Sequence, residues 1–156
     1  NISKILDAFP KQKIYLDAEA TKSVFLSHVS NSKILHIATH SEVSEQDPLF
    51  STIYLNKSDS VNGSNALYAY ELFKQQLNNE LIMLNSCSSG SGNYIQGSGI
   101  MGITRALRYA GTKSMALNLW AVNDKVASEF ASVFYTSLNS GKSKSESIRD
   151  ANPKNS

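Results

Sequence analysis

The 156-residue sequence has very little cysteine: its single thiol belongs to Cys87. One thiol cannot build an intrachain disulfide framework, and it cannot supply a CxxC metal or redox site. Cys87 is therefore either an inert buried side chain or a reactive one. A chain without disulfides suits a reducing compartment, and we expect a cytoplasmic location.

The sequence also lacks an excess of charge of either sign. It has 15 basic and 13 acidic residues, which gives a formal net charge of +2, and the basic residues are scattered along the chain. Proteins that bind nucleic acid present a concentrated basic surface to the phosphates. We therefore expect that this domain contacts no nucleic acid.

Long apolar runs are absent too, although 41% of the residues are hydrophobic. No run approaches the roughly 20 residues of a membrane-spanning helix, and the N-terminus lacks the pattern of a signal peptide. We expect a soluble chain without membrane contact that buries one core as a single domain. Because the sequence begins with Asn1 rather than Met, we also expect an upstream segment.

Apolar patterning predicts strands that alternate with helices. Residues 1–17 are expected to form a loop with one edge strand at Ile14–Leu16. Short apolar or β-branched runs predict strands at 33–38, 51–55, 80–86 and 114–120. Apolar residues at three- and four-residue spacing predict helices at 18–29, 66–77 and 99–109, from Asn123-Asp124 to about Leu138, and from near Lys142 to about Asn152. A turn is expected at Asn62-Gly63 and a helix C-cap at Gly111. This order predicts an α/β fold with a mainly parallel sheet.

His40 and Cys87 both follow the ends of predicted buried strands. Ligands of an open parallel sheet bind beyond the carboxyl ends of its strands. An imidazole beside a thiol stabilises the thiolate, so the two residues predict a catalytic dyad. The Ser/Gly-rich loop after Cys87 lets the backbone approach a substrate carbonyl, with the Cys87 amide in an oxyanion hole. The alternative is a small buried cysteine at a strand end, which is the commoner case.

The other candidate polar residues have structural explanations as well. His36 lies inside an apolar run and is expected to be a satisfied core histidine, whereas His28 is expected on a helix surface. Asp124 follows the third buried strand, just after Trp120. By default it caps the next helix, and alternatively it faces the cleft and binds a cationic substrate side chain.

Residues 97–102, Gly-Ser-Gly-Ile-Met-Gly, match the glycine pattern of dinucleotide-binding proteins. That fingerprint requires the glycines directly after a strand, whereas here a loop separates them from the strand that ends at Ser86. We therefore favour a loop that enters a helix whose small residues pack on the sheet. The sequence predicts no cofactor and no metal site.

Five motifs, in order, resemble the CHAT domain, the caspase-like module of the clan that contains separases, caspases and gingipains. They are Ile34-Leu-His-Ile-Ala-Thr-His40, Pro48-Leu-Phe-Ser51 with Leu55, Leu84-Asn-Ser-Cys87 with Gly90 and Gly92, residues 99–111, and Leu119-Trp-Ala-Val-Asn-Asp124. The resemblance covers residues 33–141 and implies a caspase-like three-layer α/β sandwich. The family's opening strand and helix have no counterpart, which implies that the chain is the C-terminal portion of a longer protein, with residues 1–156 as a peptidase domain.

The resemblance implies cysteine endopeptidase chemistry, with Cys87 as nucleophile and His40 as its base. The amides of Ser41 and Cys87 would form the oxyanion hole, and Ser41 stands where the family pattern has glycine.

Leu119 to Asp124 resembles the separase stretch that lines the P1 pocket. The resemblance thus implies a basic P1 preference, with Ser86, Trp120 and Asp124 in substrate binding. Ala121 stands where separases have an acid, so this preference depends on Asp124.

CHAT domains commonly follow tetratricopeptide repeats in bacterial proteins, some of which are linked to defence or programmed death. The implied partners are a protein substrate and upstream repeats or a regulatory protein. The alternative function is a catalytically silent CHAT scaffold that binds a protein partner in its cleft.

Overall fold

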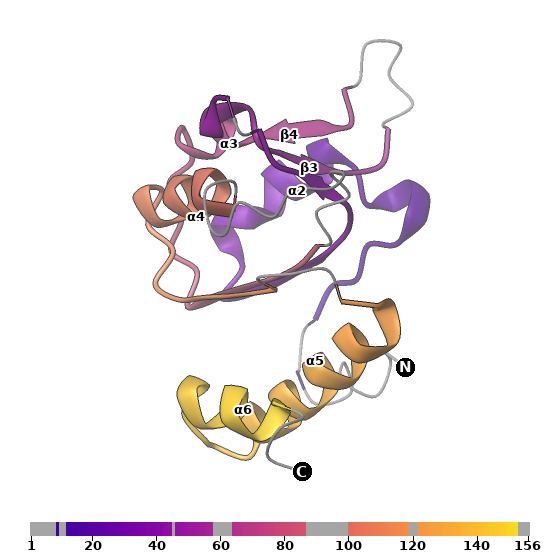
Figure 1. Ribbon diagram of the computed structural model, residues 1–156, viewed down its shortest axis with the longest axis vertical. Helices are drawn as coiled ribbons and strands as arrows, with labels where there is room; N and C mark the ends of the chain where they lie inside the picture. The colour runs from indigo at the N-terminus through magenta and orange to yellow at the C-terminus, as the bar shows by residue number, and fades with distance from the viewer. Residues whose placement is uncertain are drawn as a thin grey trace. The chain divides into compact units, whose positions relative to one another are not determined.

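A computed structural model describes residue 9 and residues 12–44, 46–57, 64–86, 100–118 and 122–152 (Figure 1). The chain divides into two compact units. The larger is Tyr15–Ala121, and the smaller combines Asn1–Ile14 with Val122–Ser156.

A parallel sheet organises the larger unit. In the described part of the chain its strands are β1 (Ile34–Ala38), β5 (Leu81–Asn85) and β6 (Met115–Leu117), in the order β1-β5-β6. The central strand is the most deeply buried, since residues 81–84 are at most 4% exposed. The predicted α/β fold with a mainly parallel sheet is confirmed, and the arrangement is compatible with a caspase-like α/β sandwich.

A hydrophobic core cluster of this unit lies on one face of the parallel sheet. Side chains alternate between the two faces of a strand. The strand register therefore groups Leu35, Ile37, Ile82, Leu84, Met115 and Leu117 on one face. These side chains pack with residues of the helices α2 (Lys22–His28) and α4 (Ile100–Tyr109), among them Phe25, Leu26, Ile103 and Leu107.

A small antiparallel sheet supplies the rest of this core. Its strands are β2 (Ser41–Glu42), β3 (Thr52–Tyr54) and β4 (Ala66–Tyr68), in that order, and β3 and β4 lie side by side in Figure 1. The fully buried Ile53 and Leu67 join the same cluster as the parallel sheet.

The prediction of one helix over 66–77 is wrong. The chain there forms β4 and then only a short helix, α3 (Ala69–Leu72). Residues 66–68 pair with β3, and the Tyr68 N–H donates to the Glu71 carboxylate at 3.0 Å where the helix begins. Strand pairing overrides the helical spacing of the apolar residues.

Three 3-10 turns, η1 (Asp17–Glu19), η2 (Val29–Asn31) and η3 (Pro48–Phe50), connect these elements. The helix predicted over 18–29 is thus confirmed in its central part as α2, with Thr21 as its N-cap. The edge strand predicted at Ile14–Leu16 is wrong, because these residues form no strand. The turn predicted at 62–63 lies outside the described residues.

The smaller unit is a helical pair, α5 (Asp124–Asn139) and α6 (Lys144–Ala151), which lie side by side in orange and yellow in Figure 1. Both helices were predicted. On α5, Phe134 and Tyr135 are buried, and the ring of Phe9 meets that of Tyr135 edge-on at 5.6 Å between centroids. Ser143 begins α6 with a capping box.

Two glycines in and after α4 are required by backbone geometry or space. Gly111 has φ +115°, and the N–H groups of Gly111 and Thr112 close the helix on Arg108 and Leu107, which confirms the predicted C-cap. At Gly102, an added Cβ would lie 2.1 Å from the carbonyl oxygen of Pro48 in η3. Helix packing therefore explains the last glycine of the dinucleotide-like pattern.

We predict that Gly102→Ala destabilises the protein by about 1–3 kcal/mol, because the methyl group forces α4 away from η3. Chemical denaturation measures this loss. The control is Arg105→Ala on the exposed side of the same helix, which should change the free energy of unfolding by no more than about 0.5 kcal/mol. Equal stability of the two variants would contradict the packing explanation.

Candidate functional site

The carboxyl ends of β1 and β5 lie side by side. Their register pairs Ala38 with Asn85. The N–H of Thr39 then donates to the carbonyl of Asn85 at 3.3 Å, which extends the pairing just past β1. The carboxyl ends of the strands that precede His40 and Cys87 in the sequence therefore lie at the same edge of the sheet.

A hydroxyl pair joins the two segments beyond the strands. Ser41 Oγ donates to Ser86 Oγ at 2.8 Å. Ser41 is only 5% exposed, and Ser86 is half-buried. Ser86 lies two residues after Leu84, so strand alternation puts its side chain on the core face of the sheet. The bond therefore lies on the core side of this edge.

His40 lies between β1 and β2 with an exposed side chain. Its backbone is held by β3, because the Tyr54 N–H donates to the His40 carbonyl at 2.9 Å. The Thr39 hydroxyl donates to the carbonyl of the same Tyr54. Sequence analysis did not identify Tyr54 as a support for His40, and the contact has no local signal because 14 residues separate the two along the chain.

The backbone of Ser41 suits the predicted oxyanion hole. The Tyr54–His40 bond makes these residues a hydrogen-bonded pair, so the next pair, Ser41 with Ile53, is a non-hydrogen-bonded one. The Ser41 N–H consequently points away from β3. Among the described residues, Asp17 is the only non-glycine with a positive φ. Ser41 thus occupies the family's glycine position without a left-handed backbone.

The prediction of His36 as a buried core histidine is wrong. His36 lies on the face of β1 opposite the core and is exposed. The Asn85 side-chain amide donates to its Nε2 at 3.2 Å. Neighbouring protein atoms lower the pKa of His36 to about 4 by desolvation, yet solvent still reaches the ring and weakens that effect. The imidazole is therefore neutral at pH 7.

His28 is half-buried near the end of α2 rather than fully on the surface. The rings of Tyr15 and His28 stack at 5.2 Å, and Tyr15 Oη lies 2.7 Å from His28 Nε2. This contact holds the segment that precedes α2.

Asp124 is not the cap of its helix, so the default prediction for it is wrong. Asn123 is the N-cap of α5, and its side chain accepts the Val126 N–H at 2.9 Å. Asp124 is the exposed first residue of the helix. Its predicted role in substrate binding stays a prediction. Cys87 and Trp120 lie outside the described residues, and their roles stay predictions too.

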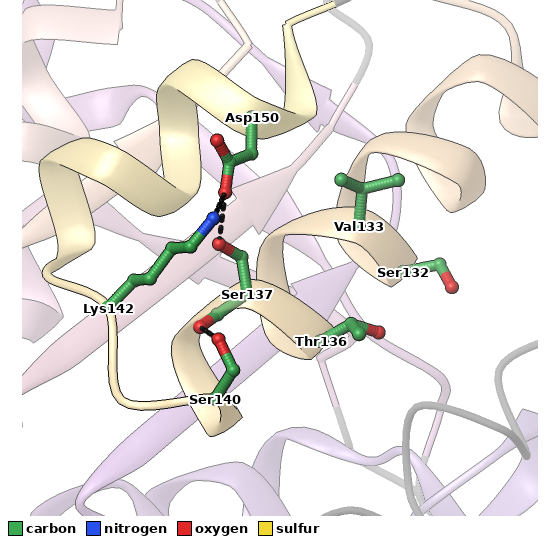
Figure 2. A pocket seen from close by; sticks show the side chains of 7 residues that line it. All are labelled: Ser132, Val133, Thr136, Ser137, Ser140, Lys142 and Asp150. Atoms are coloured by element: carbon green, nitrogen blue, oxygen red, sulfur yellow. Dashed lines mark hydrogen bonds and ion pairs between the residues drawn. The ribbon is translucent and has the colours of Figure 1, made fainter.

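A hollow of about 360 Å³ lies on the helical pair of the smaller unit (Figure 2). Four of its lining residues carry hydroxyl groups, and the full set is Ser132, Val133, Thr136, Ser137, Ser140, Lys142 and Asp150. Figure 2 shows that the Asp150 carboxylate receives both the Lys142 ammonium, at 2.7 Å, and the Ser137 hydroxyl. Asp150 already pairs with Lys142. An anionic ligand would therefore have to displace the Asp150 carboxylate before it could bind this lysine. This hollow does not support anion binding.

The described ranges contain no cluster of three or more His, Cys, Asp or Glu side chains that could hold a metal ion. Within the same ranges, no helix has both the length and the apolar character needed to cross a bilayer.

A sequence model of the CHAT domain matches residues 1–154, nearly the whole chain. The α/β sheet is compatible with a caspase-like sandwich, and the match shows that the chain belongs to the CHAT domain family, which is related to cysteine peptidases. No curated protein matches the chain significantly.

We predict that Asp150 gives the protein a pH-dependent contribution to stability. Lys142 and then Ser137 lower the pKa of Asp150 in the folded state, below the roughly 3.9 of an unfolded chain. The contribution is therefore complete above about pH 4 and is lost as the pH falls through the folded pKa.

Melting curves of wild type and Asp150→Asn measure this effect. The wild type should melt higher at pH 5–8, and the difference should shrink toward pH 2. Glu129→Gln is the control, because this exposed carboxylate lies 4.0 Å from Lys125, and such a pair contributes little. A pH-independent difference for Asp150→Asn would refute the assignment.

Proposed function

We propose that the protein is a cysteine endopeptidase that uses Cys87 as nucleophile and His40 as general base. The observation that carries the proposal is the pairing of the two strand ends, where the bonded residues Ser41 and Ser86 are the immediate neighbours of His40 and Cys87. His40 and Cys87 each come two positions after the paired residues Ala38 and Asn85 in the sequence.

The alternation of side chains supports the same dyad. Ser41 and Ser86 point to the core side of the sheet edge, where they bond to each other. In an extended chain the neighbouring side chains point the opposite way. His40 is exposed, in agreement with this rule. We propose that a substrate can reach the Cys87 thiol as well.

The proposed reaction has two steps. In the first, His40 takes the thiol proton, Cys87 Sγ bonds to the scissile carbonyl carbon, and the carbonyl electron pair moves to oxygen. The Ser41 and Cys87 amides stabilise this oxyanion. The C–N bond then breaks as the amine takes the proton from His40. In the second step, His40 deprotonates a water that attacks the thioester, which releases the acid and the thiol.

We further propose that the substrate is a protein and that upstream tetratricopeptide-type repeats or a regulatory partner control the domain. The family resemblance also supports a role in bacterial defence or programmed death. From the single thiol, the balanced charge and the lack of long apolar runs we propose a cytoplasmic location without contact with nucleic acid or membrane. A catalytically silent CHAT scaffold is the alternative that the following experiment excludes or establishes.

Labelling with a peptidyl electrophile at pH 7 tests the dyad. We expect rapid labelling of the wild type, none of Cys87→Ala, and labelling and cleavage slowed roughly 10²- to 10⁴-fold in His40→Ala, which loses its general base. The matched control is His36→Gln, an exposed histidine of the same segment, which should react like the wild type. A wild-type rate of peptide cleavage by Cys87→Ala would reject the nucleophile, and an unreactive wild type would favour the scaffold.

Peptide libraries varied at P1 test the proposed selectivity for Arg and then Lys. A carboxylate pairs bidentately with a guanidinium, so Asp124→Asn should lower turnover of Arg substrates roughly 10- to 100-fold, the value of a charge-assisted hydrogen bond, and spare neutral ones. Asn123→Ala is the control, since it removes the cap and about 1 kcal/mol of stability without changing P1 preference. An unchanged preference in Asp124→Asn, or a wild-type preference for Asp, would remove Asp124 from the pocket.

A further inference from the structure

We infer that the hydroxyl groups of Ser41 and Ser86 form a positioning pair that holds the segment carrying His40 against the segment carrying Cys87. The inference rests on the proposed function, because the pair acts through the dyad. It assigns the side chains of these serines a task beyond the oxyanion-hole role of Ser41 and the substrate-binding role of Ser86 that the family resemblance implies.

The need for such a pair follows from the paths of the two segments. In the described residues, the backbone contact of the β1 segment with β5 ends at the Thr39–Asn85 hydrogen bond. The chain then pairs with another sheet, since the His40 carbonyl binds Tyr54 and Ser41 lies opposite Ile53 of β3. His40 is therefore anchored to β3, whereas the Cys87 segment continues from β5.

The Ser41–Ser86 bond bridges the two segments where their backbones diverge. Its donor and acceptor are 2.8 Å apart, and the residues are 45 positions apart in the chain. Ser41 is 5% exposed, so its hydroxyl lies in a medium of low dielectric constant, where a hydrogen bond is strong and an unpaired hydroxyl is costly. A strong hydrogen bond at a buried hydroxyl favours a single arrangement of Ser41 and Ser86 over several.

The serine at position 41 makes this bridge possible. The family pattern has glycine there, and glycine has no hydroxyl to donate. Because Ser41 lies in a regular strand without a positive φ, the substitution adds a bond without backbone strain. The pair is thus a feature of this chain that the family's usual residue could not supply.

The consequence for catalysis is a fixed separation between imidazole and thiol. A misplacement of about 1 Å in a catalytic group can cost 10²-fold in rate. Loss of the bridge should therefore lower kcat roughly 10- to 100-fold with little change in KM. A loosened imidazole also stabilises the thiolate less, so the pH at which Cys87 becomes reactive should rise.

The test compares wild type with Ser41→Ala, Ser86→Ala, the double variant and Ser86→Thr, which keeps a hydroxyl. For each, kcat and KM are measured with a peptide substrate, and the rate of Cys87 alkylation by iodoacetamide is measured from pH 5 to pH 9. We expect the three alanine variants to show the lower kcat and an alkylation profile shifted to higher pH. The kcat of the double variant should be no lower than that of the more impaired single variant. Ser86→Thr should have the wild-type alkylation profile.

Ser147→Ala is the matched control for a purely structural loss. Ser147 is fully buried, and its hydroxyl donates to the Ser143 carbonyl at 2.9 Å in the smaller unit. This variant should lose stability without any shift of the alkylation profile. If Ser41→Ala fails to fold, Ser86→Ala and Ser86→Thr at the half-buried partner carry the comparison.

The outcomes separate the inference from the function on which it rests. A wild-type thiol that reacts quickly, together with Ser86→Ala and Ser41→Ala variants of unchanged profile and kcat, would overturn the positioning pair alone. A wild type that neither reacts nor cleaves would overturn the proposed function and the pair with it. Strictly additive effects of the two alanine substitutions would also overturn the pair, because bonded partners are expected to couple.

Discussion

The parallel pairing of β1 with β5 is the constraint on which the rest of this structure depends. Parallel strands cannot be joined by a tight turn, so the chain between Ala38 and Leu81 must travel back across the core before β5 begins. The return path has room for β2, β3, β4 and α3, whose buried residues Ile53, Leu67 and Leu72 cover the same face of the sheet. The long connection that parallel pairing requires thus supplies the elements that cover this face of the sheet.

The same constraint explains why the candidate site lies where two sheets meet. His40 follows β1 in the parallel sheet, yet Tyr54 of β3 holds its backbone. Ser86 directly follows β5, a strand of the parallel sheet. The proposed dyad is therefore assembled from one segment shared by both sheets and one segment of the larger sheet. The position of His40 depends on β3 even though no residue of β3 is assigned a chemical role.

Sequence patterns predicted the parts of this fold that depend on continuous burial. The runs that became β1, β5 and β6 are mostly apolar, and the central strand β5 is covered on both faces, since residues 81–84 are all buried. β4 was not predicted, because the spacing of Leu67, Tyr70, Leu72 and Phe73 fits a helix and only pairing with β3 overrides it. The exposure of His36 was missed because its neighbours in sequence are apolar. The Ser41–Ser86 bond could not be predicted, since local patterns carry no signal for contacts between residues 45 positions apart.

The two serines depend on each other in a way that links the stability of the fold to the geometry of the site. A buried hydroxyl at position 41 is costly unless a partner satisfies it, and Ser86 is the partner that the register of β1 and β5 brings within reach. Ser86 is half-buried and could bond to water instead, so the requirement is stronger for Ser41. The fold therefore holds Ser86, the residue before Cys87 in the sequence, next to Ser41, because the buried Ser41 hydroxyl needs a partner. A single contact thus satisfies a buried polar group and joins the two segments on which the proposed dyad depends.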